Sequence, residues 1–158
     1  MLATSFPLPE PGGVDLHVAG FGELDQRTAY ALWRLRAEVF VVEQQCFYQD
    51  LDGRDLEPGT RHVWVASDQG PIGYLRVLDE GDHARVGRVL VARPHRGRGL
   101  SDALMRTALS VIGDRPSRLS AQSPLAAWYA GYGYVQTGQE FLDDGIWHLP
   151  MTREAGKP

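Results

Sequence analysis

Hydrophobic positions along the chain follow two different periods, and these periods predict where helices and strands lie. A helical pattern without Gly or Pro begins after the candidate N-cap Asp25 and runs to about Gln45. A second, amphipathic helix begins at Leu100 and stops at Gly113, and a short third one is expected over 124–130. Short apolar or alternating runs bounded by Gly, Pro and Asp predict strands around 16–18 and over 62–66, 72–78, 84–91, 118–122, 135–137, 139–142 and 146–151.

The spacers between the strands at 62–66, 72–78 and 84–91 are short and contain glycine, which predicts an antiparallel meander. No internal repeat and no linker interrupts the pattern, so the sequence predicts a single α+β (α/β) domain over residues 14–151. Residues 1–13 hold three prolines and two glycines without periodicity. We therefore expect a poorly ordered N-terminal lead-in over 1–13 and a C-terminal tail over 152–158.

The composition narrows the class of protein. The 158 residues carry a formal net charge of −4, which argues against nucleic acid as a partner. Neither a run of about 18 apolar residues nor a secretory leader is evident, so we expect a cytoplasmic protein that does not enter a membrane. Cys46 is the only cysteine and the histidines show no ligand spacing, so the sequence predicts no metal site.

The segment from Val89 to Ser101 gives the strongest indication of function. A β-branched run ends at Pro94, passes Gly97 and Gly99, and then opens a helical pattern. That order builds a strand, a basic loop and a helix N-terminus, where the first N–H groups lack intrahelical partners and the helix dipole is positive. Glycines let a bulky anion approach these donors, so the segment predicts a pyrophosphate cradle. The alternative is a surface turn with solvated arginines.

Two motifs in this order resemble the GCN5-related N-acetyltransferase (GNAT) family. The family's acyl-CoA signature, Gln/Arg-x-x-Gly-x-Gly/Ala, falls on Arg96-Gly97-Arg98-Gly99-Leu100-Ser101, with Ser in the last position. The family's Asn-x-x-Ala-x-x-x-Tyr-x-x-x-Gly-Phe falls on Gln122-x-x-Leu125-x-x-x-Tyr129-x-x-x-Gly133-Tyr134, which keeps the Tyr and the Gly. The resemblance covers about residues 14–151.

Within that family the chain is similar to the ElaA-like branch. The strings that carry this likeness are residues 35–45 (LRAEVFVVEQQ), 48–52 (YQDLD) and 141–148 (FLDDGIWH). The short motif Arg36-x-x-Val39-Phe40 is also similar to acyl-homoserine lactone synthases, relatives on the same fold. An enzyme of that kind is therefore kept as an alternative.

The resemblance implies a GNAT fold, a mixed central sheet of about seven strands flanked by about four helices. It further implies acetyl-CoA as the co-substrate, an amine as the acceptor and, as in many relatives, a homodimer. The implied CoA-binding residues are Val89, Leu90, Val91, Arg96, Gly97, Arg98, Gly99, Leu100, Ser101, Gln122 and Tyr129. The backbone N–H of Leu90 or Val91 is expected to meet the thioester carbonyl, and Leu90 is our candidate for this catalytic position.

Tyr129 matches the family tyrosine that lies near the sulfur, so we expect it to act as the general acid. The alternative is a core tyrosine packed on its aromatic neighbours. A general base is harder to place, because the strand before the cradle reads Gly87-Arg88-Val89 and contains no carboxylate. Glu43, His148 and a chain of waters are the candidates.

Helical spacing places Arg36, Val39, Phe40 and Glu43 on one face. This face predicts either a substrate pocket, with Arg36, Phe40, Glu43 and His148 as substrate contacts, or a structural ion-pair face. Several acidic residues follow it in sequence and would attract an ammonium substrate, or would form a merely solvated loop: Glu43, Asp50, Asp52, Asp55 and Glu57. A non-catalytic CoA-binding module is the remaining alternative.

Overall fold

The computed structural model describes residues 4–7 and 13–156. Its strands form one sheet in the order β1-β2-β3-β4-β5-β6-β9-β7, and β8 also pairs with β9. The strands are β1 (Thr4–Pro7), β2 (Asp15–Ala19), β3 (Arg61–Ser67), β4 (Gly70–Asp79), β5 (Ala84–Val91), β6 (Ser117–Gln122), β7 (Val135–Gln136), β8 (Phe141–Asp143) and β9 (Ile146–Arg153). The α-helices are α1 (Gln26–Arg36), α2 (Leu100–Ile112) and α3 (Ala126–Ala130).

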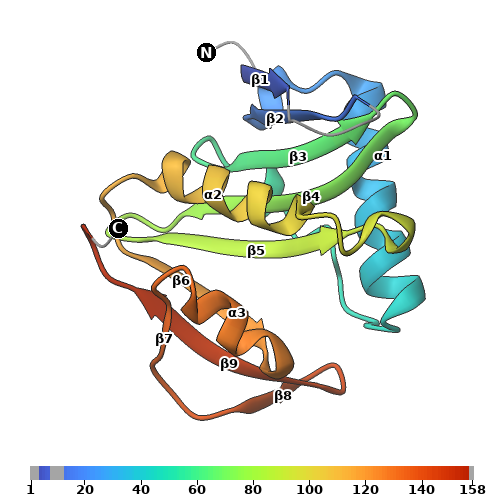
Figure 1. Cartoon of the computed structure of the whole chain (residues 1–158). Coiled ribbons are helices and arrows are strands. Elements are labelled where there is room, and N and C mark those ends of the chain that lie inside the picture. The colour runs from blue at the N-terminus through green and yellow to red at the C-terminus, as the bar shows by residue number, and fades with distance from the viewer. Residues whose placement is uncertain (1–3, 8–12, 157–158) are drawn as a thin grey trace.

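The helices divide between the two faces of the sheet, as Figure 1 shows. Helices α2 and α3 cover one face, where α2 buries Leu104 and Met105 against the apolar side of the sheet. Helix α1 covers the other face, but only over the strands from the N-terminal half of the chain, where Leu32 packs against Tyr74. The α1 face of β6 and β9 therefore lacks a covering helix and is available to form a site.

Much of the predicted element order is confirmed. Strands β3, β4 and β5 form the expected antiparallel meander, and the Asp25 side chain caps α1 by accepting a 2.8 Å hydrogen bond from the Thr28 N–H. The segment 1–13 is different, because Thr4–Pro7 forms strand β1 on β2; residues 1–3 and 8–12 lie outside the described residues. The C-terminal boundary also moves, because β9 continues to Arg153, which pairs with Ser117.

The helix predicted over about 26–45 changes type in its middle. Helix α1 ends at Arg36, and Ala37–Glu43 continues as a π-helix that ends with a 3.0 Å bond from the Gln44 N–H to the Val39 carbonyl. The segment is not buried on all sides, because the Val42 residue is 72% exposed. A π-helical turn is wider than an α-helical one and often marks a functional site.

Strands β5 and β6 are parallel neighbours that separate after two residue pairs. Ala84 pairs with Ser117 and Arg85 with Arg118, and no further pair follows. The remaining part of β5, Gly87–Val91, is paired only on its β4 side. The sheet is thus mixed, as predicted, and it opens where the cradle segment begins.

Candidate active site

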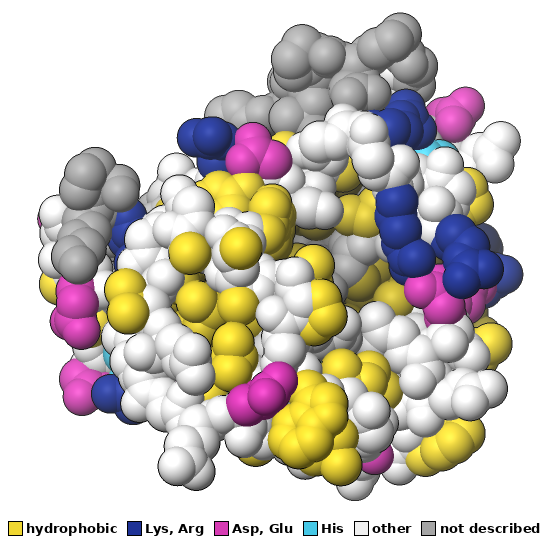
Figure 2. Space-filling view, turned by 60° about the horizontal axis from the view of Figure 1, so that its bottom comes forward, with side chains coloured by type: hydrophobic (Ala, Val, Ile, Leu, Met, Phe, Trp, Pro, Cys, Tyr) yellow, Lys and Arg dark blue, Asp and Glu magenta, His cyan; other side chains and the backbone are white. Residues whose placement is uncertain are grey.

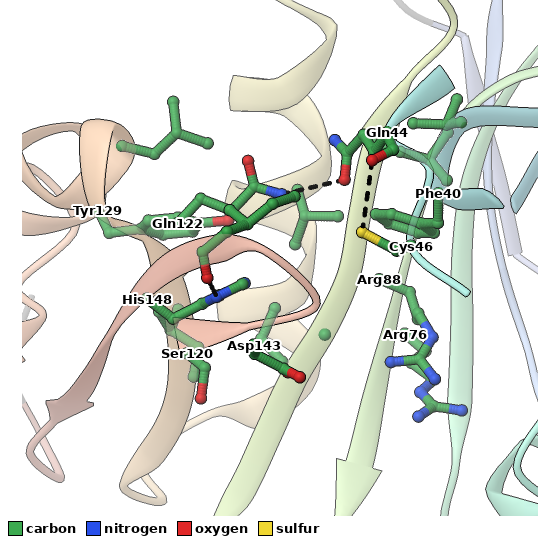
Figure 3. Close-up of a pocket in the computed structure, with 18 of the residues that line it drawn as sticks. Phe40, Gln44, Cys46, Arg76, Arg88, Ser120, Gln122, Tyr129, Asp143 and His148 are labelled. Atoms are coloured by element: carbon green, nitrogen blue, oxygen red, sulfur yellow. Dashed lines mark hydrogen bonds between the residues drawn. The ribbon is translucent and has the colours of Figure 1, made fainter. Parts of the chain in front are cut away.

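A cavity of about 780 Å³ fills the opening between β5 and β6. Its walls come from β5, β6, the π-helical segment Ala37–Glu43 and the hairpin formed by β8 and β9. Figure 2 shows a hollowed face of the molecule, with arginine and acidic side chains gathered side by side along one rim. Figure 3 shows that the lining side chains converge from segments far apart in the sequence.

The start of α2 has the geometry of an anion cradle. Gly97 and Gly99 adopt φ values of +77° and +78°, in the region that favours glycine, and Gly99 is the N-cap of α2. Within the described part of the chain, the N–H groups of Gly97, Gly99, Leu100 and Ser101 have no hydrogen-bond partner. Adding a Cβ at either glycine meets nothing within 4 Å, so the loop is open in front of these donors. The residues present therefore fit a bulky anion such as a diphosphate.

The two arginines of this loop are held by other groups. Arg96 donates from Nε to the Val91 carbonyl at 2.9 Å, and its Nη1 lies 2.8 Å from a carboxylate oxygen of Glu43. Arg98 places Nη1 2.9 Å from Nδ1 of His95. Arg96 thus spans the entrance between the cradle and the π-helical segment.

Backbone direction distinguishes Leu90 from Val91. In an antiparallel ladder, successive residues direct their N–H and C=O groups to opposite sides of the strand. The Ala92 N–H bonds to the Ile72 carbonyl at 2.8 Å, and Leu90 pairs with Tyr74, so both residues face β4. The main chain of Val91 therefore faces the opening, which agrees with its bond to Arg96. The Leu90 N–H does not point toward the cavity, because the ladder with β4 uses it.

Tyr129 lies at the end of the cavity formed by α3 (Figure 3). The residue is 6% exposed, and its ring packs edge-on against Trp128 and Tyr134. Burial raises the pKa of its hydroxyl well above the ordinary value, so the group keeps its proton at neutral pH. Among the described residues this hydroxyl has no hydrogen-bond partner, and it is free to donate to a ligand in the cavity.

His148 lines the same cavity from β9. Its Nδ1 lies 2.8 Å from the Ile146 carbonyl, and its ring stacks on Phe141 with the centroids 5.7 Å apart. Because a carbonyl only accepts, Nδ1 carries the hydrogen and Nε2 of the neutral ring keeps its lone pair. The ring is therefore held with a proton-accepting nitrogen available.

Phe40, Glu43 and Gln122, three of the predicted ligand contacts, also line the cavity. The Glu43 carboxylate is bound by Arg96, which makes it a poorer candidate for the base than His148. Gln122 donates from Nε2 to Oε1 of Gln44 at 3.1 Å and so connects β6 to the π-helical segment across the opening.

Arg36 is not a lining residue, so the geometry does not agree with its predicted substrate contact. Its side chain is fully buried and binds Asp50 at 3.0 Å and Asp55 at 2.6 Å. The same cluster includes Arg76 on Asp52 and Asp55, and Arg88 on Asp50. The alternative of a structural ion-pair face thus describes Arg36, and these aspartates are neutralised by arginines.

Several lining residues escaped the sequence reasoning: Cys46, Arg76, Arg88, Ser120, Asp143 and Asp144. One signal was visible, because Arg76 is a charged residue inside the apolar strand run 72–78. A charge at such a position is either paired or part of a site. Asp143 and Asp144 gave no such signal, because a carboxylate in a hairpin turn is ordinary.

Comparisons with known family models, sequences and structures all indicate the same family. A model of the acetyltransferase (GNAT) domain matches residues 18–155. A UPF0039 protein of Mycobacterium bovis is 49% identical over 138 residues, which cover 83% of this chain and 87% of that protein. Protein ElaA of Escherichia coli is 37% identical over 147 residues, which cover 89% and 94% of the two chains. The crystal structure of an acyl-CoA N-acyltransferase from Pseudomonas aeruginosa matches with a TM-score of 0.85 and 39% identity, over 89% and 99%.

The chain therefore belongs to the GNAT family of acyltransferases and has the fold of acyl-CoA N-acyltransferases. The predicted resemblance to this family, and to its ElaA-like branch, is confirmed. A CoA-dependent acyl-homoserine lactone synthase, BjaI, matches with a TM-score of 0.68 at 18% identity, which shows a shared fold alone. Within the described ranges, no helix has the length and apolarity to cross a bilayer, and no group of three potential metal ligands occurs.

Proposed function

We propose that this protein is an N-acyltransferase that moves an acetyl group from acetyl-CoA to an amine. The observation that carries this proposal is the opening of β5 away from β6 beside the unpartnered N–H groups at the start of α2. A donor with a diphosphate at one end and an amide-containing arm at the other fits both features at once. The family membership supports the same reaction class.

The cradle residues Gly97, Gly99, Leu100 and Ser101 would hold the diphosphate of CoA through their N–H groups. The main chain of Val91 would pair with the amides of the pantetheine arm, because it faces the opening. Arg96 now occupies the Val91 carbonyl, so its side chain must leave this position when the arm binds. Its released charge is then available to the diphosphate.

The bound donor supplies an activated carbonyl, and the residues of this chain supply the proton transfers. Nε2 of His148 accepts the proton of the attacking amine while the new C–N bond forms. The Val91 N–H stabilises the charge that develops on the carbonyl oxygen, a type of contact worth about 3–4 kcal/mol. As the C–S bond breaks, the Tyr129 hydroxyl protonates the sulfur. The proton taken by His148 returns to solvent, and solvent restores the Tyr129 proton.

The proposal is tested with Gly99→Glu and the matched control Gly81→Glu. Both glycines have positive φ, +78° and +87°, and open space around the Cα, so both substitutions introduce similar local strain. Gly99→Glu places a carboxylate in the cradle and is expected to weaken acetyl-CoA binding at least about 100-fold, which calorimetry measures. Gly81→Glu lies in the turn between β4 and β5 and should bind normally.

The chemical step is measured as free CoA released in the presence of a panel of amines. Amine-dependent release that disappears with Gly99→Glu supports acyl transfer. Tight binding of acetyl-CoA without release by any amine would instead identify a CoA-binding module and contradict the proposed reaction.

A further inference from the structure

One end of the cavity is formed by arginines that face two carboxylates. Arg76 of β4 and Arg88 of β5 lie on one side, and Asp143 of the β8–β9 hairpin lies on the other (Figure 3). Asp144 of the same hairpin also lines the cavity. This end lies away from the cradle, because Arg76 pairs with Gly87 at the far part of β5. It is therefore on the acceptor side of the reaction proposed above.

One nitrogen of the Arg76 guanidinium has no hydrogen-bond partner among the described residues. The residue is 3% exposed, and its Nη1 and Nη2 bind Asp52 at 2.9 and 2.6 Å. Its Nη1 also binds Asp55 at 3.1 Å. Its Nε is buried and has no hydrogen-bond partner among the residues that the structure describes. A buried donor left in this state costs about 1–3 kcal/mol, so such a group needs an explanation in its surroundings.

Arg88 presents a second donor to the same region. Its Nε binds Asp50 at 2.8 Å, its Nη2 binds the Asp50 carbonyl at 3.1 Å, and its guanidinium lies over the Tyr48 ring at 5.0 Å. No bond to its Nη1 is present within residues 4–7 and 13–156. The Arg88 backbone has φ +54° at the bulge between β4 and β5, an uncommon conformation for a residue with a Cβ.

The facing carboxylates differ from every aspartate of the ion-pair cluster. Asp143 and Asp144 form no ion pair with any described residue. Their charges reach into the cavity, because after burial they are the next causes that raise the pKa of the Cys46 thiol on the opposite wall. An approaching ammonium group is attracted toward this hairpin, next to His148.

We propose that Arg76 Nε and Arg88 Nη1 together bind a carboxylate of the acceptor, so that the acceptor is an amine whose other end is a carboxylate. This inference rests on acyl transfer to an amine as the proposed function. A guanidinium N–H bonded to a carboxylate is charge-assisted and about twice as strong as a neutral hydrogen bond.

The positions also set the length of the acceptor. Gly87, opposite Arg76, and the reacting region at Val91 are four residues apart on β5. At about 3.3 Å per residue this corresponds to roughly 13 Å along the strand, less the contraction at the bulge. The amine and the carboxylate are thus separated by several bonds, as in an ω-amino acid or a short peptide, and an α-amino acid is too short.

The first test measures the carboxylate site without catalysis. Hexanoate, which has the carboxylate but no amine, is titrated by calorimetry into the protein saturated with CoA. We expect binding to the wild type and a loss of at least about tenfold in affinity for Arg88→Gln, with unchanged CoA affinity. Arg118→Gln, which removes an exposed arginine of β6 outside the cavity, is the matched control and should bind hexanoate normally. Absence of hexanoate binding to the wild type would overturn the inference.

The second test compares acceptors in the acyl-transfer assay. We expect kcat/KM for 6-aminohexanoate to exceed that for hexylamine and 6-aminohexanamide by at least about tenfold, and Arg88→Gln to remove this preference while keeping the rate with hexylamine. A dipeptide such as glycylglycine separates a peptide terminus from a free amino acid as the source of the same groups. Equal use of all the amines would overturn the inference and leave the proposed function standing. Hexanoate binding without acyl transfer to any amine would contradict the proposed function but leave the carboxylate-binding site standing.

Discussion

The two walls of the cavity use charge in opposite ways. On the wall built from β4, β5 and the loop before β3, Asp50, Asp52 and Asp55 are all paired with arginines. On the wall built from β6, α3 and the β8–β9 hairpin, the Tyr129 hydroxyl and Nε2 of His148 have no partner among the described residues. The first wall satisfies most of its polar groups internally, and the second leaves these two polar atoms without an internal partner.

This difference separates stability from chemistry. An ion pair in which both side chains are buried is costly to break, because removing one partner leaves the other as an unpaired buried charge. Groups that await a ligand contribute little to folding but decide the reaction. The ion-paired wall therefore comes from the N-terminal half of the chain, and the residues for which we propose proton transfer come from the C-terminal half.

The largest expected effect is on the wall built from β6, α3 and the β8–β9 hairpin, which we call the reactive wall. Tyr129→Phe removes the proton donor for the leaving sulfur and should lower kcat by about 10²–10⁴-fold, with little change in CoA affinity. Steady-state rates and calorimetry measure the two quantities. The control is Tyr132→Phe, whose hydroxyl binds Asp102 and does not line the cavity. An unchanged kcat for Tyr129→Phe would remove the tyrosine from the mechanism.

Substitutions on the wall built from β4, β5 and the loop before β3, which we call the scaffold wall, should change the free energy of unfolding. Asp55→Ala leaves the buried charges of Arg36 and Arg76 without one of their partners. We expect the free energy of unfolding to fall by about 3–5 kcal/mol, measured by urea denaturation. Glu38→Ala breaks the exposed pair with Arg34 and should cost less than about 1 kcal/mol. Similar losses for both variants would show that the cluster has no special role.

A smaller kinetic effect is expected for His148→Gln, again on the reactive wall. Glutamine keeps the size of the side chain but cannot accept the proton of the amine, so kcat should fall by about 10²-fold or somewhat less. Acetyl-CoA affinity should stay the same, because His148 lies on β9, away from the cradle. Glu43→Gln is the comparison variant. A larger loss of kcat for Glu43→Gln would assign the base to the π-helical segment instead.

The smallest effect concerns pH and the scaffold wall. Hydrogen bonds from Arg76 hold the pKa of the Asp52 carboxyl well below its ordinary value. A lowered folded-state pKa gives stability that is complete above the unfolded pKa of about 4 and is lost as the pH falls further. The destabilisation by Asp52→Asn should therefore be about 1 kcal/mol smaller at about pH 3 than at about pH 7.

The sequence was informative where one local pattern decides the structure. Strands β3, β4 and β5 are apolar runs ended by turns, and Gly97 and Gly99 require the positive φ that the structure shows. The antiparallel meander and the open glycine loop followed from these features, whereas the GNAT fold was implied by the family resemblance. Tyr129 followed from a motif in register with the cradle, and the structure places its side chain in the cavity.

Features that depend on pairing between distant segments were beyond the sequence pattern. The separation of β5 from β6, and with it the orientation of Val91 toward the opening, is set by the register of the sheet. The change from α1 to a π-helix gives no signal in the sequence, because the same apolar residues are compatible with both kinds of helix. Arg36 was assigned two roles that only its partners Asp50 and Asp55 could separate.

The bond from Arg96 to the Val91 carbonyl has a consequence for solubility. An open strand edge with free N–H and C=O groups is a template on which another chain can add a strand, the first step toward aggregation. In the proposed function this open edge receives the acyl donor, so the hazard cannot be removed by pairing the strand. The Arg96 side chain covers the edge at the Val91 carbonyl and is held there by Glu43, so it hinders the addition of a foreign strand and, in the proposed reaction, is displaced by the donor.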